Sequence, residues 1–113
     1  MRVLIYGAIS YTNTAAIITK LNAVHTATPA EIIVDGTNRL TDQTGRIWAA
    51  SKGVPWLAYQ YVLNGAGFAG MYSRALKLIL SANPGLVLTF GADFDVSAVA
   101  NCAKSFGISV QAT

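Results

Sequence analysis

The sequence predicts an α/β domain in which helices cover both faces of a parallel sheet. Strand-type and helix-type segments alternate strictly along the chain, and two of the strand-type segments, 2–6 and 86–90, are continuous apolar runs that each end at a glycine. Such runs are typical of central parallel strands that are buried on both faces. Strict alternation favours three layers with right-handed crossovers, and we expect five strands in the order 3-2-1-4-5.

The expected strands are short and rich in aliphatic, β-branched or aromatic residues. In chain order they are Arg2–Tyr6, Glu31–Val34, Trp56–Tyr61, Leu86–Phe90 and Ile108–Ala112. The third of these segments follows Pro55, which has no backbone N–H to donate, so we expect that strand at an edge of the sheet.

The first two expected helices have capping signals at their ends. Thr12 or Asn13 caps the first, and Thr41 or Asp42 caps the second, which spans about Asp42–Ser51 and stops before Gly53. Apolar residues three or four positions apart mark the face of each helix that packs on the sheet. These residues are Ile17, Ile18, Leu21 and Val24 in the first helix, and Ile47 and Trp48 in the second.

The last two expected helices lie in the second half of the chain. The third spans roughly Met71–Ala82 and is ended by the Asn-Pro-Gly segment that follows it. Asp95 or Ser97 caps the fourth, which runs to Gly107. The glycine-rich segment 63–70 connects the third strand to the third helix, either as a lid or as a tight connection.

The composition indicates one soluble domain that covers residues 1–113. Only 12% of the residues are charged and 53% are hydrophobic, which favours a large core over disorder. No apolar run reaches the roughly 18 residues of a membrane helix, and no signal peptide is recognisable, so we expect a cytoplasmic protein. The net charge of +3 comes from scattered cations rather than a basic cluster, which argues against nucleic acid as a partner.

Metal and thiol chemistry have little support in the sequence. Cys102 is the single cysteine, and its apolar helix position favours a buried, inert thiol. His25 is the single histidine, and we expect it on the surface at a helix end. We therefore expect no metal site and no cofactor.

Glycines at the ends of three strands indicate where a ligand would bind. In a sheet of this order, ligands bind beyond the carboxyl ends of the strands, where the strand order reverses. The loops Gly7–Tyr11 and Gly91–Asp95 would face each other there, with Gly36 alongside. Glycine lets a backbone approach a phosphate or sugar closely, although strand-to-helix turns often contain glycine for other reasons. The spelling Gly65-x-Gly67-x-x-Gly70 lacks the strand and acidic residue of a dinucleotide fingerprint, and we treat it as accidental.

The polar residues expected at this edge do not form a known catalytic arrangement. The carboxylates are Asp35, Asp42, Asp93 and Asp95, and the candidate phosphate partners are Arg39, Arg46 and Arg74. A carboxylate there could bind a ribose hydroxyl or act as a base, although helix capping explains Asp42 and Asp95 equally well.

The order of these signals resembles the SLOG superfamily, the Rossmann-like group that includes the Lonely-guy phosphoribohydrolases and DNA-processing protein A. It is most similar to the short, single-domain YspA-like branch common in bacteria and phages. The resemblance implies a Rossmann-like fold, a pocket for nucleotides or nucleotide-derived molecules, and a homodimer. The matching pieces are Met1–Gly7 with Tyr11; Ile33–Gly36; Asp42 with Trp48, Ala49, Gly53 and Val54; Ala69 and Gly70 with Arg74 and Leu78; and Phe90 and Gly91 with Gly107–Val110.

The chain departs from the family pattern where chemistry would take place. The first loop reads Gly7-Ala-Ile instead of Gly-Ser-Arg, and the Gly-Gly-x-Gly-Thr loop has become Gly91-Ala-Asp-Phe-Asp95. The second loop has Asp35 where the family has a glycine, and the Arg-Asn pair before the third helix reads Arg74-Ala75. Ala98 stands where the hydrolase members have a catalytic glutamate. These departures argue against phosphoribohydrolase activity, and the added carboxylates oppose an anionic ligand.

Three functions are compatible with the sequence. The first is binding of a nucleotide-derived small molecule without turnover, by Gly7, Ser10, Gly36, Thr37, Asp42, Arg74 and Gly91. The second is hydrolysis of an N-glycosidic or phosphate-ester bond, with Asp42 or Asp93 as the base and Arg74 as the electrophilic partner. The third is a protein-interaction domain that has lost its ligand, with Tyr59, Tyr61 and Phe68 as its contact residues.

Overall fold

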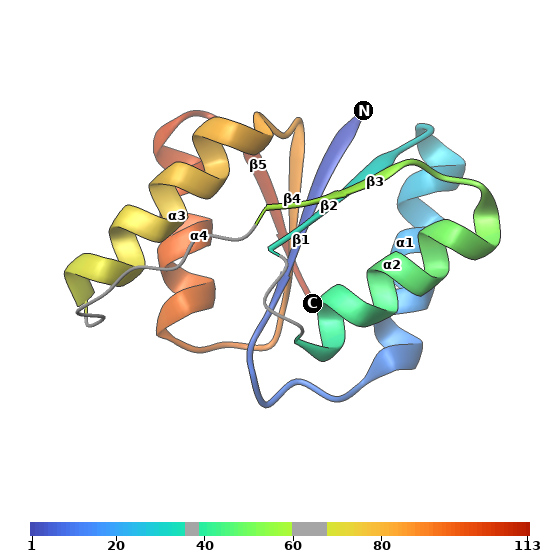
Figure 1. Cartoon of the computed structure of the whole chain (residues 1–113), viewed down its shortest axis with the longest axis horizontal. Helices are drawn as coiled ribbons and strands as arrows, with labels where there is room; N and C mark the ends of the chain where they lie inside the picture. Colours follow the sequence, from blue (N-terminus) through green and yellow to red (C-terminus); the bar gives the residue numbers. More distant parts are fainter. Residues whose placement is uncertain (36–38, 60–67) are drawn as a thin grey trace.

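A computed structural model describes residues 1–35, 39–59 and 68–113, and in them strands and helices alternate (Figure 1). The strands are β1 (Arg2–Gly7), β2 (Glu31–Val34), β3 (Trp56–Ala58), β4 (Leu86–Phe90) and β5 (Ser109–Ala112). The helices are α1 (Thr14–Ala27), α2 (Leu40–Lys52), α3 (Phe68–Ala82) and α4 (Phe94–Ser105). Gly36 and Thr37, Tyr61 and the 63–67 part of the glycine-rich connection lie outside the described residues.

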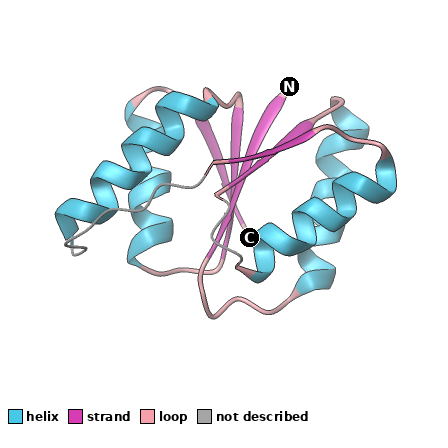
Figure 2. Ribbon diagram, in the orientation of Figure 1, coloured by secondary structure: helices cyan, strands magenta, loops and turns pink. Residues whose placement is uncertain are grey.

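The sheet has five parallel strands in the order β3-β2-β1-β4-β5, which confirms the predicted fold class and strand order. In its register Arg2 pairs with Glu31 of β2, and Val3 pairs with Leu86 of β4. On one side of β1 lie β2 and then β3, and on its other side lie β4 and then β5. The strand order therefore reverses between β1 and β4, at the centre of the sheet (Figure 2).

The two faces of the sheet have separate cores, because successive side chains of a strand point to opposite faces. Helices α1 and α2 cover one face, and α3 and α4 cover the other (Figure 1). Val3 and Ile5 belong to the cluster on the α1/α2 face, whereas Leu4 and Tyr6 belong to the cluster on the α3/α4 face. This two-sided burial explains why β1 is apolar after Arg2, its first residue.

Helix α1 agrees with its predicted start but only partly with its predicted apolar face. Asn13 caps it, and the Asn13 side-chain oxygen accepts a hydrogen bond from the Ala16 N–H at 3.1 Å. Ile17 and Leu21 are buried, but Ile18 is 41% exposed.

Helix α2 starts earlier than predicted, and the predicted cap residues are wrong. Its N-cap is Arg39, which makes no capping hydrogen bond with its side chain. Thr41 and Asp42 are instead fully buried inside the first turn. Trp48 packs into the core as expected, but Ile47 is 72% exposed and does not face the sheet. Gly53 ends the helix with φ at +66°, a conformation that glycine adopts without strain, as predicted.

Helix α4 is capped by Asp93, so the prediction of Asp95 or Ser97 is wrong. The Asp93 Oδ1 atom accepts a hydrogen bond from the Val96 N–H at 2.8 Å. Because the helix begins at Phe94, Asp95 falls in its first turn, where its carboxylate is available for a contact in another part of the fold.

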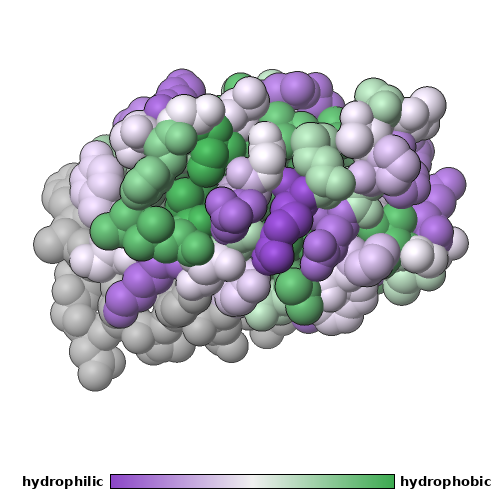
Figure 3. Space-filling view, turned by 90° about the horizontal axis from the view of Figure 1, so that it is seen from above, coloured by the Kyte–Doolittle hydropathy of each residue, from purple (hydrophilic) through white to green (hydrophobic). Residues whose placement is uncertain are grey.

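The remaining boundaries differ from the predicted ones by one to three residues. β1 extends to Gly7, β5 begins at Ser109, and α3 begins at Phe68 rather than Met71. β3 ends at Ala58 and lies at the edge of the sheet, as expected from Pro55. Seen from the end where the strands begin, hydrophobic surface gathers over α3, which exposes Tyr72, Leu76 and Leu80 (Figure 3).

Replacing Ile17 with alanine should lower the free energy of unfolding by about 2–5 kcal/mol, because removal of this fully buried side chain would leave a cavity under α1. The adjacent Ile18→Ala variant is the matched control, and it should cost less than about 1 kcal/mol because Ile18 is 41% exposed. Urea unfolding followed by circular dichroism measures both. Equal losses in the two variants would contradict the orientation of α1.

Candidate functional site

The loops that follow β1 and β4 contact each other at the carboxyl ends of the strands, as the sequence predicted. The Ala8 N–H donates to the Phe90 carbonyl oxygen at 2.8 Å, and the Ile9 N–H approaches Asp93 Oδ2 at 3.4 Å. Gly91 has φ at +77°, and a Cβ atom there would lie 3.1 Å from the side chains of both Ala8 and Tyr11. The contact between the two loops therefore requires glycine at position 91.

Gly7 is required by packing within the protein. A Cβ atom at Gly7 would lie 1.9 Å from Oγ1 of Thr41, in the first turn of α2. The missing side chain lets the N-terminal turn of α2 lie directly on the end of β1. This accounts for the glycine without a ligand.

Arg39 connects three elements beneath this edge of the sheet. Its guanidinium donates to the Gly7 carbonyl oxygen at 3.1 Å and pairs with Asp95 Oδ2 at 2.7 Å. The same guanidinium lies 4.7 Å from the centre of the Tyr6 ring, a cation–π contact. The Arg39 side chain is 8% exposed and that of Asp95 is 19% exposed, so the pair is largely removed from water.

A second ion pair lies between the end of β2 and helix α3. Arg74 of α3 pairs with Asp35, which follows β2 and is fully buried. The sequence had suggested Arg74 as a partner for a ligand phosphate. In the structure its charge is already matched by a carboxylate of the protein.

These groups together give the site a balanced charge, with two guanidinium groups and two carboxylates around Tyr6. Burial raises the pKa of the Tyr6 hydroxyl above its ordinary value, and Asp35 raises it further, against the opposing effect of Arg39 and Arg74. Burial alone would lower the pKa of Arg39, but Tyr6 and the hydrogen bond to Asp95 raise it, and the net shift is upward. At neutral pH Tyr6 is a neutral phenol and Arg39 is a cation.

The other predicted polar residues differ in how accessible they are. Ser10 is exposed in the loop after β1, whereas Asp42 is fully buried. Asp93 uses both carboxylate oxygens, Oδ1 for Val96 and Oδ2 for Ile9. A shallow hollow of about 370 Å³ opens beside Asp93, and its lining residues are Ala92, Asp93, Phe94 and Ser97. Arg46 lies outside this edge and stacks on Trp56.

The single histidine and the single cysteine occupy structural positions. His25 lies in the last turn of α1, at a helix end as predicted, but it is half-buried rather than fully on the surface. Its Nδ1 accepts from the Ala30 N–H at 3.0 Å, and its ring meets Trp48 edge-on. Cys102 is half-buried rather than fully buried, and burial raises its pKa. Within residues 1–35, 39–59 and 68–113, no three metal-ligating side chains come together. No helix among those residues combines the length and the apolar character needed to cross a membrane.

Sequence reasoning missed both ion pairs. It named Arg39, Arg74, Asp35 and Asp95 separately, as ligand partners or caps. The pairs join residues 56 and 39 positions apart, and no local spacing signals a contact over such a distance.

A three-layer sheet of this order, with polar groups gathered at the carboxyl ends of its strands, defines a Rossmann-like domain. Residues 1–61 match the family described as "YspA, cpYpsA-related SLOG family", which covers more than half of the chain. The chain therefore belongs to this SLOG family. A search among curated proteins found no match.

Solved structures with the same fold include larger enzymes. The UDP-GlcNAc 2-epimerase of Neisseria meningitidis bound to UDP-GlcNAc is similar with a TM-score of 0.62 and 13% identity, over 99% of this chain and 32% of the epimerase. The S. aureus MnaA–UDP co-structure has a TM-score of 0.61 and 12% identity, over 99% and 30%. The chain thus spans about a third of the length of these proteins.

One similar structure is of comparable size. The C-terminal domain of the PF1911 hydrogenase from Pyrococcus furiosus has a TM-score of 0.57 and 16% identity, over 99% of this chain and 90% of that domain. At these identities the similarities establish the fold alone.

Replacing Arg39 with methionine should destabilise the protein more than replacing Arg39 and Asp95 together. The single variant leaves a largely buried carboxylate without its cation, at a cost of about 2–3 kcal/mol, less than for a fully buried pair because Asp95 is 19% exposed. In Arg39→Met/Asp95→Asn no charge remains, and at least half of the loss should be recovered. Chemical unfolding of the single and double variants gives the coupling energy. Additive losses would contradict the pairing.

The raised pKa of Tyr6 should make stability fall at alkaline pH. Above about pH 10 the phenol ionises in the unfolded chain but stays protonated in the folded one, so the unfolded state is favoured as the pH rises. Tyr6→Phe removes this contribution, so its free energy of unfolding should fall less between about pH 9 and about pH 11. Identical pH profiles for the two proteins would disprove the shift.

Proposed function

We propose that this domain binds a nucleotide or a nucleotide-derived small molecule at the carboxyl ends of the strands and does not turn it over. The observation that carries the proposal is that the loops after β1 and β4 meet where the strand order reverses, with one largely buried ion pair at the end of β1 and another at the end of β2. Membership of a SLOG family supports it. The similarity to structures solved with UDP-GlcNAc or UDP is consistent with it.

In this proposal the exposed backbone around the two loops binds the ligand directly. Ser10, which is exposed in the loop after β1, donates a hydrogen bond. Gly7, Gly36, Thr37 and Gly91 are kept as contacts proposed from the sequence. Arg74 meets a polar group of the ligand. Asp42 was named from the sequence as a partner of sugar hydroxyls, but it is fully buried, so we do not place it against the ligand.

The balanced charge of the site favours a ligand that is recognised mainly through hydroxyl groups and a base. Arg39 and Arg74 already have carboxylate partners, so a phosphate gains little net attraction from them. The N-terminus of α4, which could otherwise attract an anion, is capped by Asp93. We therefore propose that a nucleoside moiety contributes more binding energy than a phosphate does.

We exclude turnover from the proposal because neither candidate base, Asp42 nor Asp93, can reach a ligand's proton. A general base must reach the proton that it removes. Asp42 is fully buried, and both oxygens of Asp93 accept backbone hydrogen bonds. Ala98, at the position of the hydrolases' catalytic glutamate, is buried within α4 and has no ionisable group.

The protein-interaction alternative has less support from the residues first suggested for it. Tyr59 is half-buried and packs against the core on the α3/α4 face, with its hydroxyl accepting from Arg2 at 3.3 Å. Tyr61 and the side chain of Phe68 lie outside the described part of the chain. A homodimer, which the family resemblance implies, and a cytoplasmic location, which the composition led us to expect, are kept as part of the proposal.

A thermal-shift panel tests the proposal with nucleosides, nucleoside monophosphates, cyclic nucleotides, UDP, UDP-GlcNAc and ADP-ribose. A ligand at about ten times its Kd should stabilise the fold by about 1.4 kcal/mol, or roughly 5 °C in Tm. Nucleosides should shift Tm at least as much as their monophosphates at equal concentration. Chromatography of the mixtures should show no product.

Variants then locate the site. Asp35→Asn/Arg74→Ala keeps the charge balanced and should abolish the ligand-induced shift, whereas the exposed Lys104→Ala should leave it unchanged. An unchanged shift in the double variant would remove Arg74 from the site. Product formation that Asp42→Asn abolishes would favour the hydrolase, and no shift with any ligand would favour the interaction domain.

A further inference from the structure

Three exposed apolar residues lie at the carboxyl ends of the strands. Ile9 lies in the loop after β1 and is 73% exposed, and Leu40 begins α2 and is 36% exposed. Phe94 begins α4 and is 68% exposed. We refer to these three residues as the apolar rim. The contacts proposed above for the ligand are all glycines or polar residues, so they leave the apolar rim without a function.

Two interactions bring the apolar rim to one place. The Ile9 N–H approaches, at 3.4 Å, the carboxylate of the helix cap that directly precedes Phe94. Arg39 directly precedes Leu40, and its guanidinium pairs at 2.7 Å with Asp95, the residue after Phe94. Since both interactions are made by neighbours of Phe94, this residue is the centre of the rim.

Phe94 lines a hollow that also contains a polar side chain. The hollow has a volume of about 370 Å³, and its other lining residues are Ala92, Asp93 and Ser97. Small-molecule sites have volumes of roughly 300–1,000 Å³. Ser97 lies three positions after Phe94 in α4, so the two residues share one side of the helix. Ser97 is exposed, and a hydroxyl both donates and accepts hydrogen bonds.

The start of α4 does not require an aromatic residue at position 94. Asp93 already caps the helix, since its Oδ1 accepts from the Val96 N–H at 2.8 Å. A hydrophobic staple would join the residue before the cap to the fourth residue of the helix, and these are Ala92 and Ser97. Phe94 also has an interaction within the protein, yet 68% of the residue is accessible. Most of its surface is therefore open to a ligand.

The charge beside the hollow disfavours the anionic part of a nucleotide. Asp93 lines the hollow, so a phosphate placed there would approach a carboxylate directly. A nucleobase is neutral and planar, and every base has a π-face that stacks favourably on an aromatic side chain. Of the parts of a nucleotide, the base therefore fits this hollow best.

We propose that the hollow beside Phe94 binds the base of the ligand, which stacks on the Phe94 ring and forms a hydrogen bond with the Ser97 hydroxyl. This inference rests on the proposed function, and it adds which part of the ligand is recognised and which residue recognises it. With its base in the hollow, a nucleoside directs its sugar to the loop after β1, where Ser10 is exposed. Phe94 thus selects ligands that contain an aromatic ring over sugar phosphates that lack one.

Ligand-observed NMR tests this with adenosine, uridine, their 5′-monophosphates, and ribose 5-phosphate as the ligand without a base. As protein is added, the resonances of the base protons should move more than those of the sugar protons, because the base lies on the aromatic ring. The titration gives Kd for each ligand. Ribose 5-phosphate should bind at least about tenfold more weakly than the two nucleoside monophosphates.

Variants at the two ends of α4 assign the binding to the hollow. Phe94→Ala should weaken nucleoside binding about tenfold because the stacking surface is lost, and Phe94→Tyr should retain it. Phe106→Ala is the matched control, since Phe106 is 51% exposed at the C-terminal end of the same helix, and Kd should be unchanged. Ser97→Ala should weaken binding by a few-fold.

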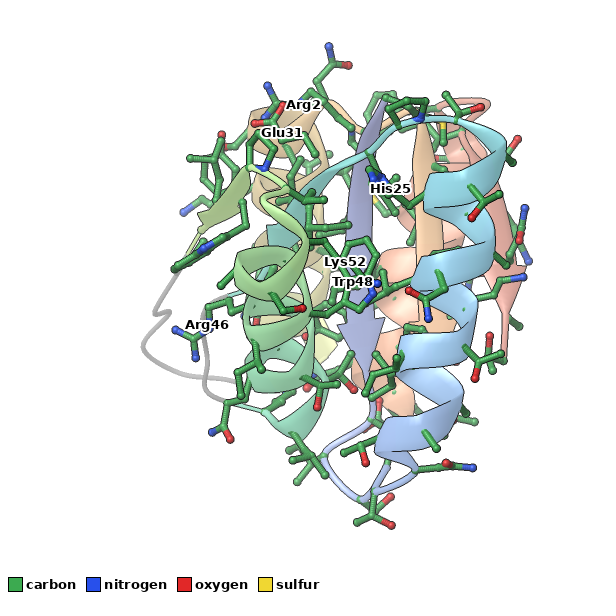
Figure 4. All side chains as sticks on the ribbon, turned by 90° about the vertical axis from the view of Figure 1, so that its right-hand side faces the viewer. Arg2, His25, Glu31, Arg46, Trp48 and Lys52 are labelled. Carbon is green, nitrogen blue, oxygen red and sulfur yellow. The ribbon has the colours of Figure 1, made fainter. Side chains whose placement is uncertain are left out.

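Tryptophan fluorescence shows whether Phe94→Ala folds as the wild-type protein does. Trp48 lies between α1 and α2 (Figure 4), is 4% exposed, and donates its indole N–H to Asn22 Oδ1 at 2.8 Å. These helices cover the face of the sheet opposite to α4 (Figure 1), so Trp48 reports on folding without contacting the hollow. The emission spectra of the variant and the wild-type protein should coincide.

The results that would overturn the inference are distinct from those that would overturn the proposed function. No binding of any nucleoside or nucleotide to the wild-type protein would overturn both. Nucleoside binding that Phe94→Ala leaves unchanged, or equally tight binding of ribose 5-phosphate, would overturn the inference alone, because the ligand would then bind through other groups. A dimer in sedimentation experiments that Phe94→Ala dissociates would also overturn it, because the apolar rim would then join two copies of the chain.

Discussion

The guanidinium of Arg39 holds together the edge of the sheet where the candidate site lies. It joins the end of β1 through Gly7, the first turn of α4 through Asp95, and the ring of Tyr6 beneath them. A largely buried cation is stable only with its partners in place, so these three elements have one arrangement relative to each other. The positions of the Gly7 and Gly91 loops, and hence the shape of the site, depend on this contact.

The same contact limits what the site can recognise. Arg39 and Asp95, like Arg74 and Asp35, neutralise each other inside the protein, and Tyr6 remains a neutral phenol between them. A strongly anionic ligand would have to compete with these carboxylates for the arginines. A ligand that uses hydroxyls, a base and the backbone leaves both pairs intact, which is why the balance favours nucleoside recognition.

The sequence was sufficient for the fold because β1 and β4 are apolar at almost every position and end in glycine, which identifies central parallel strands. It was insufficient for the starts of α2 and α4. Asp93, Asp95 and Asp42 are all suitable caps by local rules, and the choice among them depends on the distant partner Arg39 and on the packing of α2 against Gly7. Periodicity likewise marked Ile47 as apolar without fixing which side of α2 faces the sheet, since Trp48 occupies that side.

The distribution of charge explains how a modest net charge of +3 gives a cationic outer surface. The two internal ion pairs use two cations and two carboxylates, so six cations and three carboxylates remain from the original eight and five. Of those three, Asp42 is buried and Asp93 caps α4. Arg46 and Lys52 are the cations of α2, and the exposed Ile47 follows Arg46 in that helix. Helix α2 contributes to the candidate site through Thr41, which packs against Gly7 at the start of the helix.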